Sequence, residues 1–365
     1  MSDVQRGLGE LTGKGLTHAE RAAKSGQTDR QLENCTFVKG VLLLIIIFSH
    51  SIAFWRGNWF TAIEPGRSLG GTSIIIDFVS NFHVYAFTLV AGYIYYYVRY
   101  ERGGYQHYIP FLMNKVKRLL VPYISIGLLW AVPFYCLFYK MGYIEIAKRL
   151  LIGDYTAQLW YVLMLFWLFA IVWPFSNMIK KGKCFLLTIA AVAVYLFPLV
   201  ASGFIKYDFG IFDAMIHFPF FVIGFKIRQY KGLDKKIPTA ISVGIYVAMF
   251  AAKCGLAGCE GLCAKALYQA VIFAARISGS FMAWKVLQWA GEKIQWNTKV
   301  FSFYLSRSMP VYLLHQQIVY CSLWLFNGIN PLLHVCMNFI LALGVSLIVA
   351  TLMMRTKFTR CLIGG

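Results

Sequence analysis

The segment FVKGVLLLIIIFSHSIAFW, residues 37–55, has the length and composition of a membrane-spanning helix but contains two ionisable side chains. A transmembrane helix needs about 20 consecutive, mostly apolar residues. Lys39 stands near the start of the segment and His50 well inside it. At 1.5 Å and about 100° per residue, they lie about 16 Å apart along the helix axis and only about 20° apart around it. We therefore expect them on one helix face, with Lys39 near the inner surface and His50 near mid-membrane.

The rest of the chain has the same membrane-like composition. Of its 365 residues 59% are hydrophobic and 14% are charged, whereas soluble domains have about 25% charged residues. Ten apolar segments are predicted as spans, at about 38–55, 73–97, 119–139, 159–179, 184–204, 210–227, 238–253, 266–290, 308–326 and 332–353. The alternation typical of a β-barrel is absent. The sequence thus predicts an all-α, polytopic membrane bundle of about ten transmembrane helices.

Charge predicts the orientation of this bundle. Most of the 35 Lys and Arg residues fall in segments that share one side of the membrane with the N-terminus, and such residues concentrate in the cytoplasm. We expect both termini there, with residues 1–36 as a mobile tail without signal-peptide features, residues 37–354 as the membrane domain and residues 355–365 as a short basic tail. Topology accounts for most of the net charge of +20, so no nucleic-acid partner is expected.

The nine cysteines show no metal-binding spacing. Cys254, Cys259 and Cys263 cluster in a predicted outer loop, where a disulfide is conceivable, but the odd number of cysteines favours unpaired thiols. No metal and no permanently bound cofactor is expected.

Several further ionisable residues fall inside predicted spans, where they are costly and are functional candidates by default. His83 and Arg276 are expected near mid-depth, His315 in the inner half of its span, and Asp77 about a turn from the outer surface. Asp77 and His83 differ by about 240° around a regular helix, so only an irregularity would turn both toward one spot. Asp77 is the only acidic residue well inside a span, which makes it the leading candidate to orient a histidine.

Structural explanations compete with these functional ones. His83 and His217 could each simply satisfy a backbone carbonyl, and Lys39 could extend its amine to the inner surface. Asp77 could only pin the outer end of its helix. Arg276 is harder to explain in this way, because a guanidinium at mid-membrane requires partners or water.

A buried histidine suits acyl transfer chemistry. It can take a proton from a hydroxyl that attacks a thioester and then return it, in a site that excludes water and stabilises the oxyanion. Cations at the cytoplasmic end could hold the phosphates of a nucleotide-bearing donor. Lys115, Lys117 and Arg118 in MNKVKRLLVPY are the candidates, unless they serve only to set topology.

Six motifs in order resemble the integral-membrane acyltransferase-3 family over residues 35–350. They are FVKGVLLLIIIFSHS, FHVYAFTLVAGYIYYY, KVKRLLVPY, LWYVLMLF, HFPFFVIGF and SMPVYLLHQQI. The basic residue, ten residues and then histidine of the first motif fall on Lys39 and His50, and lysine at this position resembles the branch of fucose and polysaccharide O-acetylases. In the second motif, Val84 and Tyr85 replace Met-Pro, and Ala91 replaces a serine.

The resemblance implies an enzyme in the bacterial cytoplasmic membrane that moves an acyl group, commonly acetyl from acetyl-CoA, to a hydroxyl of a cell-envelope carbohydrate. His50 would be the general base or a transient acyl carrier, and Lys39 would bind a phosphate of the donor or polarise the site from the inner side. Arg276 would bind the acceptor or stabilise developing charge. His315 and Trp160, with His83, would line the acceptor site. The partners would be acetyl-CoA, a polysaccharide or lipid-linked glycan, and membrane lipids.

Two other classes of protein remain open at this stage. A transporter or flippase of a lipid-linked glycan would also carry charges at mid-membrane, but the sequence shows neither an inverted repeat nor the broken helices expected of one. The third possibility is a non-catalytic partner in a glycan-synthesis complex.

Overall fold

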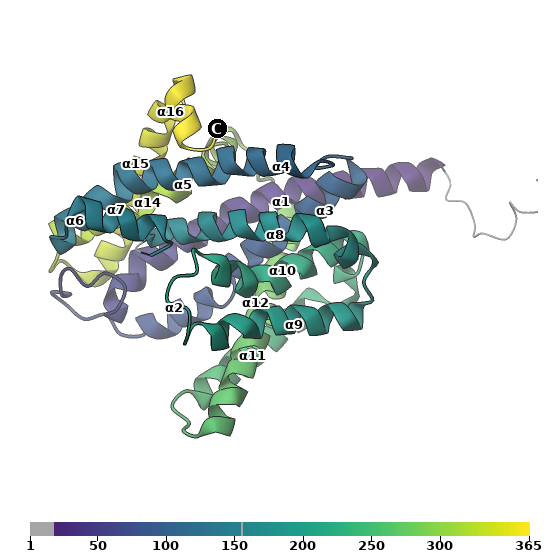
Figure 1. The fold of residues 1–365 in the computed structure, drawn as a ribbon, viewed down its shortest axis with the longest axis horizontal. Helices are drawn as coiled ribbons and strands as arrows, with labels where there is room; N and C mark the ends of the chain where they lie inside the picture. Colours follow the sequence, from purple (N-terminus) through teal and green to yellow (C-terminus); the bar gives the residue numbers. More distant parts are fainter. Residues whose placement is uncertain (1–17, 155) are drawn as a thin grey trace, which may run out of the picture.

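The computed structural model describes residues 18–154 and 156–365, and every regular element within them is helical (Figure 1). Eight helices have at least 18 residues. They are α1 (His18–Ile52), α8 (Trp160–Lys181), α9 (Cys184–Ala201), α10 (Ile211–Gln229), α11 (Thr239–Leu256), α12 (Leu262–Lys293), α14 (Ser308–Leu325) and α15 (Pro331–Met353).

Two further segments are interrupted helices. The first consists of α2 (Thr72–Ser80), α3 (His83–Tyr96) and the π-helical turn η2 (Tyr97–Glu101). The second alternates α4 (Tyr108–Lys115), η3 (Val116–Leu120), α5 (Val121–Ile126), η4 (Gly127–Ala131) and α6 (Val132–Tyr139), in which η3 and η4 are π-helical. Short elements complete the chain: η1 (Ala53–Arg56), α7 (Tyr143–Leu151), η5 (Ala157–Leu159), η6 (Asp234–Lys236), α13 (Lys299–Leu305) and α16 (Lys357–Leu362).

All ten predicted spans are largely helical, and seven helical segments of the described chain are long and apolar enough to cross a membrane. These are Leu32–Arg56, Thr72–Glu101, Tyr108–Tyr139, Ala157–Lys181, Thr239–Leu256, Leu262–Lys293 and Pro331–Met353. The apolar helix Phe185–Ala201 is shorter. Helices α10 and α14 fall outside this set and carry buried polar side chains such as His217 and His315. The prediction of an all-helical membrane protein is confirmed, whereas the count of ten spans and the orientation of the termini stay predictions.

Parts of both predicted tails are helical. Residues 1–17 lie outside the described residues, and residues 18–36 form the first part of α1. With 35 residues, α1 is about 52 Å long, which exceeds the roughly 30 Å of a bilayer core. Residues 357–362 form α16, which packs against α5, where the Ser125 hydroxyl donates to the Leu362 carbonyl at 2.6 Å.

Helix α3 begins after a break that the sequence analysis does not anticipate. The chain turns at Asn81 and Phe82, between α2 and α3. The Asn81 side chain donates to the Asp77 carbonyl at 2.6 Å, and the Phe82 amide donates to the Val79 carbonyl at 3.1 Å. The expectation that the chain contains no broken helix is therefore wrong. The break places His83 at the first position of α3, with its side chain buried.

Helices α3 and α10 approach each other closely because glycines face the opposite backbone. A Cβ atom at Gly92 would lie 2.0 Å from the Phe221 carbonyl oxygen, and one at Gly224 would lie 1.8 Å from the Leu89 carbonyl oxygen. Small residues allow this kind of backbone contact between membrane helices. The contact holds the N-terminal parts of both helices, with His83 and His217, against one shared cavity.

Helices α11 and α12 form a hairpin that projects from the bundle, at the bottom of Figure 1. Cys254, Cys259 and Cys263 lie at its tip as free, exposed thiols.

Candidate functional site

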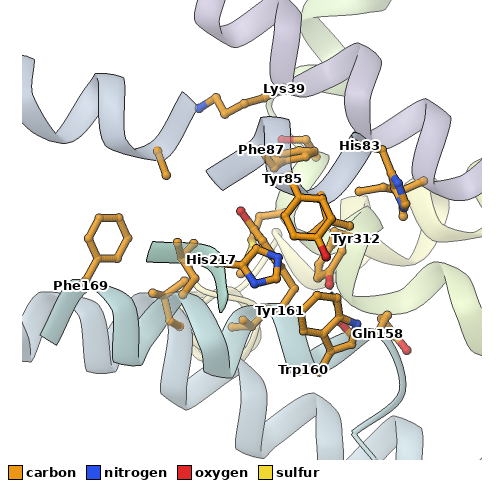
Figure 2. Close-up of a pocket in the computed structure, with 18 of the residues that line it drawn as sticks. Lys39, His83, Tyr85, Phe87, Gln158, Trp160, Tyr161, Phe169, His217 and Tyr312 are labelled. Carbon is orange, nitrogen blue, oxygen red and sulfur yellow. Dashed lines mark hydrogen bonds between the residues drawn. The ribbon is translucent and has the colours of Figure 1, made fainter. Parts of the chain in front are cut away.

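A cavity of about 470 Å³ lies inside the bundle, between α1, α3, α8, α10 and α14 (Figure 2). Its polar and aromatic lining includes Lys39, His50, Ser80, His83, Tyr85, Tyr95, Tyr105, Lys115, Gln158, Trp160, Tyr161, Phe169, His217, Ser308 and Tyr312. In Figure 2 the Lys39 amine and Phe169 lie toward the left, and His83, Trp160 and Gln158 lie toward the right. The cavity therefore extends along α1 from Lys39 to His50.

His50 is paired with a second histidine, which comes from α14. Its Nδ1 atom lies 2.9 Å from Nε2 of His315, and the two rings are stacked at a centroid distance of 5.0 Å. His315 is fully buried, and its Nδ1 lies 2.7 Å from the Tyr312 carbonyl oxygen and 3.3 Å from the Val311 carbonyl oxygen. His315 thus connects His50 to backbone carbonyls of α14 through its two ring nitrogens.

These carbonyls determine which nitrogen of each ring carries a proton. A carbonyl only accepts, so Nδ1 of His315 must be the N–H donor, and in the neutral ring Nε2 is then an acceptor. His50 must donate its Nδ1–H to that acceptor. The remaining nitrogen of a neutral His50, Nε2, therefore carries a lone pair, as a general base or a nucleophile requires.

Trp59 covers His50 from the segment between η1 and α2. Its ring centroid lies 5.2 Å from that of His50 and 5.0 Å from that of Tyr320. The neighbouring Phe60 stacks on Tyr320 at 4.4 Å. The segment is also tied to the chain between α14 and α15, because the Gly66 amide donates to the Asn327 side chain at 2.9 Å. An aromatic cover of this kind shields a reacting centre from water.

Only one of the three cations predicted in the KVKR motif reaches the cavity. Lys115 lines it, with its amine 3.9 Å from the centre of the Phe169 ring and 3.5 Å from the Tyr105 hydroxyl. Lys117 and Arg118 are exposed and do not line the cavity. Lys39 also lines the cavity, and its amine lies on the same side as Phe169 in Figure 2.

Beyond Phe169, the cavity is also lined by His83, Trp160 and His217. His83 and His217 each present Nδ1 to the carbonyl four residues earlier in the chain, at Val79 and Asp213 respectively, and both distances are 2.8 Å. The carbonyl contacts expected of structural histidines are thus present, yet both residues also line the cavity. The Trp160 ring lies 5.6 Å from that of His217.

Asp77 and Arg276 are not part of the cavity wall, although Arg276 lies behind the lining residue Tyr85. Asp77 forms an ion pair with Arg56 at 3.0 Å, and within the described residues it has no hydrogen bond or ion pair with a histidine. Arg276 donates to the Tyr195 hydroxyl at 2.9 Å and lies 5.1 Å from the centre of the Tyr85 ring. Neither residue lines the cavity. The residue in contact with the His50 ring nitrogen is His315, where sequence reasoning favoured Asp77.

Gln158 and Trp59 are not predicted as site residues from the sequence, and His217 is left open between a structural and a functional role. Gln158 lines the cavity and exchanges two side-chain hydrogen bonds with Gln317 of α14, at 2.8 and 3.1 Å. The consecutive polar residues His315, Gln316 and Gln317 within an apolar helix were the available signal for this network. Within the described chain, no group of three or more His, Cys, Asp or Glu side chains could hold a metal ion.

Comparison with known proteins gives a family match that spans most of the chain. A family model described as an acyltransferase domain matches residues 34–354. No curated protein and no solved structure matches the chain significantly.

Proposed function

The chain belongs to the acyltransferase-3 family of membrane acyltransferases, and on this premise we propose that it is an O-acyltransferase that uses acyl-CoA. The acyl group is acetyl, and the acceptor is a hydroxyl of a cell-envelope or exported polysaccharide or glycolipid. The protein resides in the bacterial cytoplasmic membrane, crosses it ten times and has both termini in the cytoplasm, as the distribution of Lys and Arg favours.

One observation carries this proposal: a single cavity is lined by His50 and by two lysines, Lys39 and Lys115. Acyl transfer from CoA requires an anion-binding region for the donor's phosphates, an apolar passage and a base at the reacting carbonyl. The cavity wall includes both amines, apolar side chains and His50, and Lys39 and His50 lie about 16 Å apart along α1.

In the proposed reaction, Nε2 of His50 takes the proton of the acceptor hydroxyl while the hydroxyl oxygen attacks the thioester carbonyl. The new C–O bond gives a tetrahedral intermediate, which collapses by breaking the C–S bond. The leaving CoA thiolate then receives the proton from Nε2–H of His50. His315 accepts the Nδ1–H bond throughout, which orients the His50 ring and keeps its lone pair directed away from α14.

Lys39 and Lys115 hold the donor in this mechanism. An amine provides three hydrogen-bond donors and a full charge to a phosphate group. Trp59 excludes water from the other side of His50, so that the thioester is attacked by the acceptor and not by water.

The test uses purified protein in detergent micelles, with acetyl-CoA labelled in its acetyl group and candidate glycans. Micelles have no separate compartments, so a transporter cannot produce labelled glycan in them. The proposal predicts acetyl-labelled glycan and saturable binding of acetyl-CoA. Absence of transfer to every acceptor, together with absence of acetyl-CoA binding, would contradict it.

The same experiment separates a base from an acyl carrier. If His50 acts only as the base, the protein incubated with labelled acetyl-CoA and no acceptor stays unlabelled. Acetyl label that becomes bound to wild-type protein, and does not bind to a His50→Ala variant, would instead assign the carrier role.

A further inference from the structure

His217 presents an unused hydrogen-bond acceptor beside the cavity. Its side chain is 3% exposed, and its Nε2 atom is buried with no hydrogen-bond partner among the described residues. Nδ1 lies 2.8 Å from the Asp213 carbonyl oxygen, so in the neutral ring Nδ1 is the donor and Nε2 has only a lone pair. A buried polar atom without a partner is costly, and a ligand that donates a hydrogen bond would remove this cost.

Aromatic rings surround His217. The Tyr85 ring stacks on it at 4.8 Å with an interplanar angle of 15°, and Trp160 lies 5.6 Å away at a tilt. Tyr85, Trp160 and His217 all line the cavity and lie near one another in Figure 2. A sugar ring presents apolar C–H faces and hydroxyl edges, and it therefore fits a pocket of aromatic faces with a few polar groups.

His83 has the same hydrogen-bond pattern from a different helix. Its Nδ1 lies 2.8 Å from the Val79 carbonyl oxygen, so its Nε2 is also an acceptor in the neutral ring. Together with Nε2 of His50, three ring nitrogens on the cavity wall accept and do not donate.

The charged groups of the cavity are placed elsewhere. Among the described residues that line it, those with a charged side chain are Lys39 and Lys115. The Lys115 amine lies 3.9 Å from the centre of the Phe169 ring, and the Lys39 amine lies on the same side as Phe169 in Figure 2. The guanidinium of Arg276 lies over the Tyr85 ring, 5.1 Å from its centre, and donates to Tyr195. A carboxylate beside His217 and His83 would face their ring lone pairs. Sugar hydroxyl groups can donate to these nitrogens and can also accept from the Tyr161 hydroxyl, which lines the cavity and has no hydrogen-bond partner among the described residues.

We propose that His217 and His83, with the rings of Tyr85 and Trp160, form the acceptor subsite and select an uncharged sugar ring over one that carries a carboxylate. This inference rests on the proposed acyl transfer, because it assigns the sugar end of the same cavity. His217 is a specificity-determining residue in this account, and the tautomers imposed by the Asp213 and Val79 carbonyls are the cause of the selection.

The first test uses wild-type protein and pairs of methyl glycosides that differ at one carbon. Methyl glucoside is compared with methyl glucuronoside, and methyl galactoside with methyl galacturonoside, by saturation-transfer NMR in detergent micelles. We expect the neutral member of at least one pair to bind at least about tenfold more tightly. Equal or tighter binding of the acids would overturn the inference, and so would failure of every neutral glycoside to bind at millimolar concentration.

The second test uses the variant His217→Phe, which keeps a stacked ring and removes the acceptor nitrogen. We expect the KM for the neutral acceptor to rise about tenfold, with the KM for acetyl-CoA unchanged. His334→Phe is the matched control, because His334 is also buried and bonded to a backbone carbonyl, at 3.1 Å from Ser322, but lies outside the cavity.

The outcomes separate this inference from the proposed function. Wild-type protein that transfers no acetyl group to any acceptor contradicts the proposed function. Wild-type protein that is active, together with a His217→Phe variant whose acceptor KM equals that of wild type, overturns only the subsite. A rise in the acetyl-CoA KM of His217→Phe equal to that of the acceptor KM also overturns it. If His217→Phe does not fold, the glycoside pairs decide the question with wild-type protein.

Discussion

Replacing His315 by Phe should sharply reduce turnover while leaving donor binding intact. The substitution keeps a buried ring beside His50 and removes the Nε2 atom that accepts the 2.9 Å hydrogen bond from Nδ1. Without this partner, His50 can carry its proton on either nitrogen and can rotate. A neutral hydrogen bond contributes about 0.5–1.5 kcal/mol, and each 1.4 kcal/mol is a factor of about ten.

If the substitution only loosens the orientation of the His50 ring, kcat should therefore fall by a few-fold to about tenfold, which is the smallest loss expected. The upper bound is the whole contribution of a general base, about 10²–10⁴-fold, if the wrong tautomer predominates. We expect kcat to fall within this range and the KM for acetyl-CoA to stay constant, because His315 does not line the cavity that would hold the donor.

His315→Gln is the informative partner variant. Its side-chain oxygen can accept the Nδ1–H bond of His50, so kcat should be largely restored relative to His315→Phe. Initial rates of acetyl transfer would be measured at saturating acceptor, with acetyl-CoA binding as the check on folding. Wild-type kcat in His315→Phe would refute the role assigned to the histidine pair, and equal losses in both variants would show that His315 acts only through packing.

Three further predictions follow from the same geometry. Lys115→Gln should raise the Kd for acetyl-CoA by about ten- to a hundredfold, since a charge-assisted hydrogen bond contributes about 1.5–3 kcal/mol. Lys117 is exposed, so Lys117→Gln should leave this Kd unchanged. A larger rise in Kd for Lys117→Gln than for Lys115→Gln would reject the assignment of the donor site. Gly224→Ala should lower the Tm or prevent folding, because the added methyl would lie 1.8 Å from a carbonyl oxygen of α3. The control Gly244→Ala places its methyl in open space and should be tolerated. Equal stability of the two variants would argue against close packing of α3 and α10. Trp59→Ala should raise acetyl-CoA hydrolysis several-fold relative to transfer by opening His50 to water, and an unchanged ratio of free acetate to acetylated glycan would remove its role as a cover.

The first helix could be interpreted from sequence because its geometry is regular. The helical repeat predicts that Lys39 and His50 share a face, and both residues line the same cavity. All ten apolar segments were found as helices, because long apolar runs give a strong signal.

Contacts between helices could not be obtained in this way. His315 is 265 residues from His50 in the chain, and no local pattern specifies that α14 packs beside α1. Asp77 appeared to be the best partner for a histidine because it was the one acidic side chain at depth. The Asp77 carboxylate instead forms an ion pair with Arg56. Arg56 ends η1, and the sequence does not predict that this element lies beside α2.

The break before His83 was missed for a related reason. The residues Asn81 and Phe82 include neither Gly nor Pro, which are the usual signals of a helix interruption. Here an asparagine side chain bonded to the Asp77 carbonyl accompanies the turn.

The most direct test of the account is the rate of acetyl transfer from labelled acetyl-CoA to glycan by wild-type protein, by His50→Ala and by the control His334→Ala. His334 is a buried histidine outside the cavity, so its loss reports only on the effect of removing a buried ring. The account predicts that His50→Ala lowers kcat by about 10²–10⁴-fold while it still binds acetyl-CoA, and that His334→Ala remains active. Transfer at the wild-type rate by His50→Ala would contradict it.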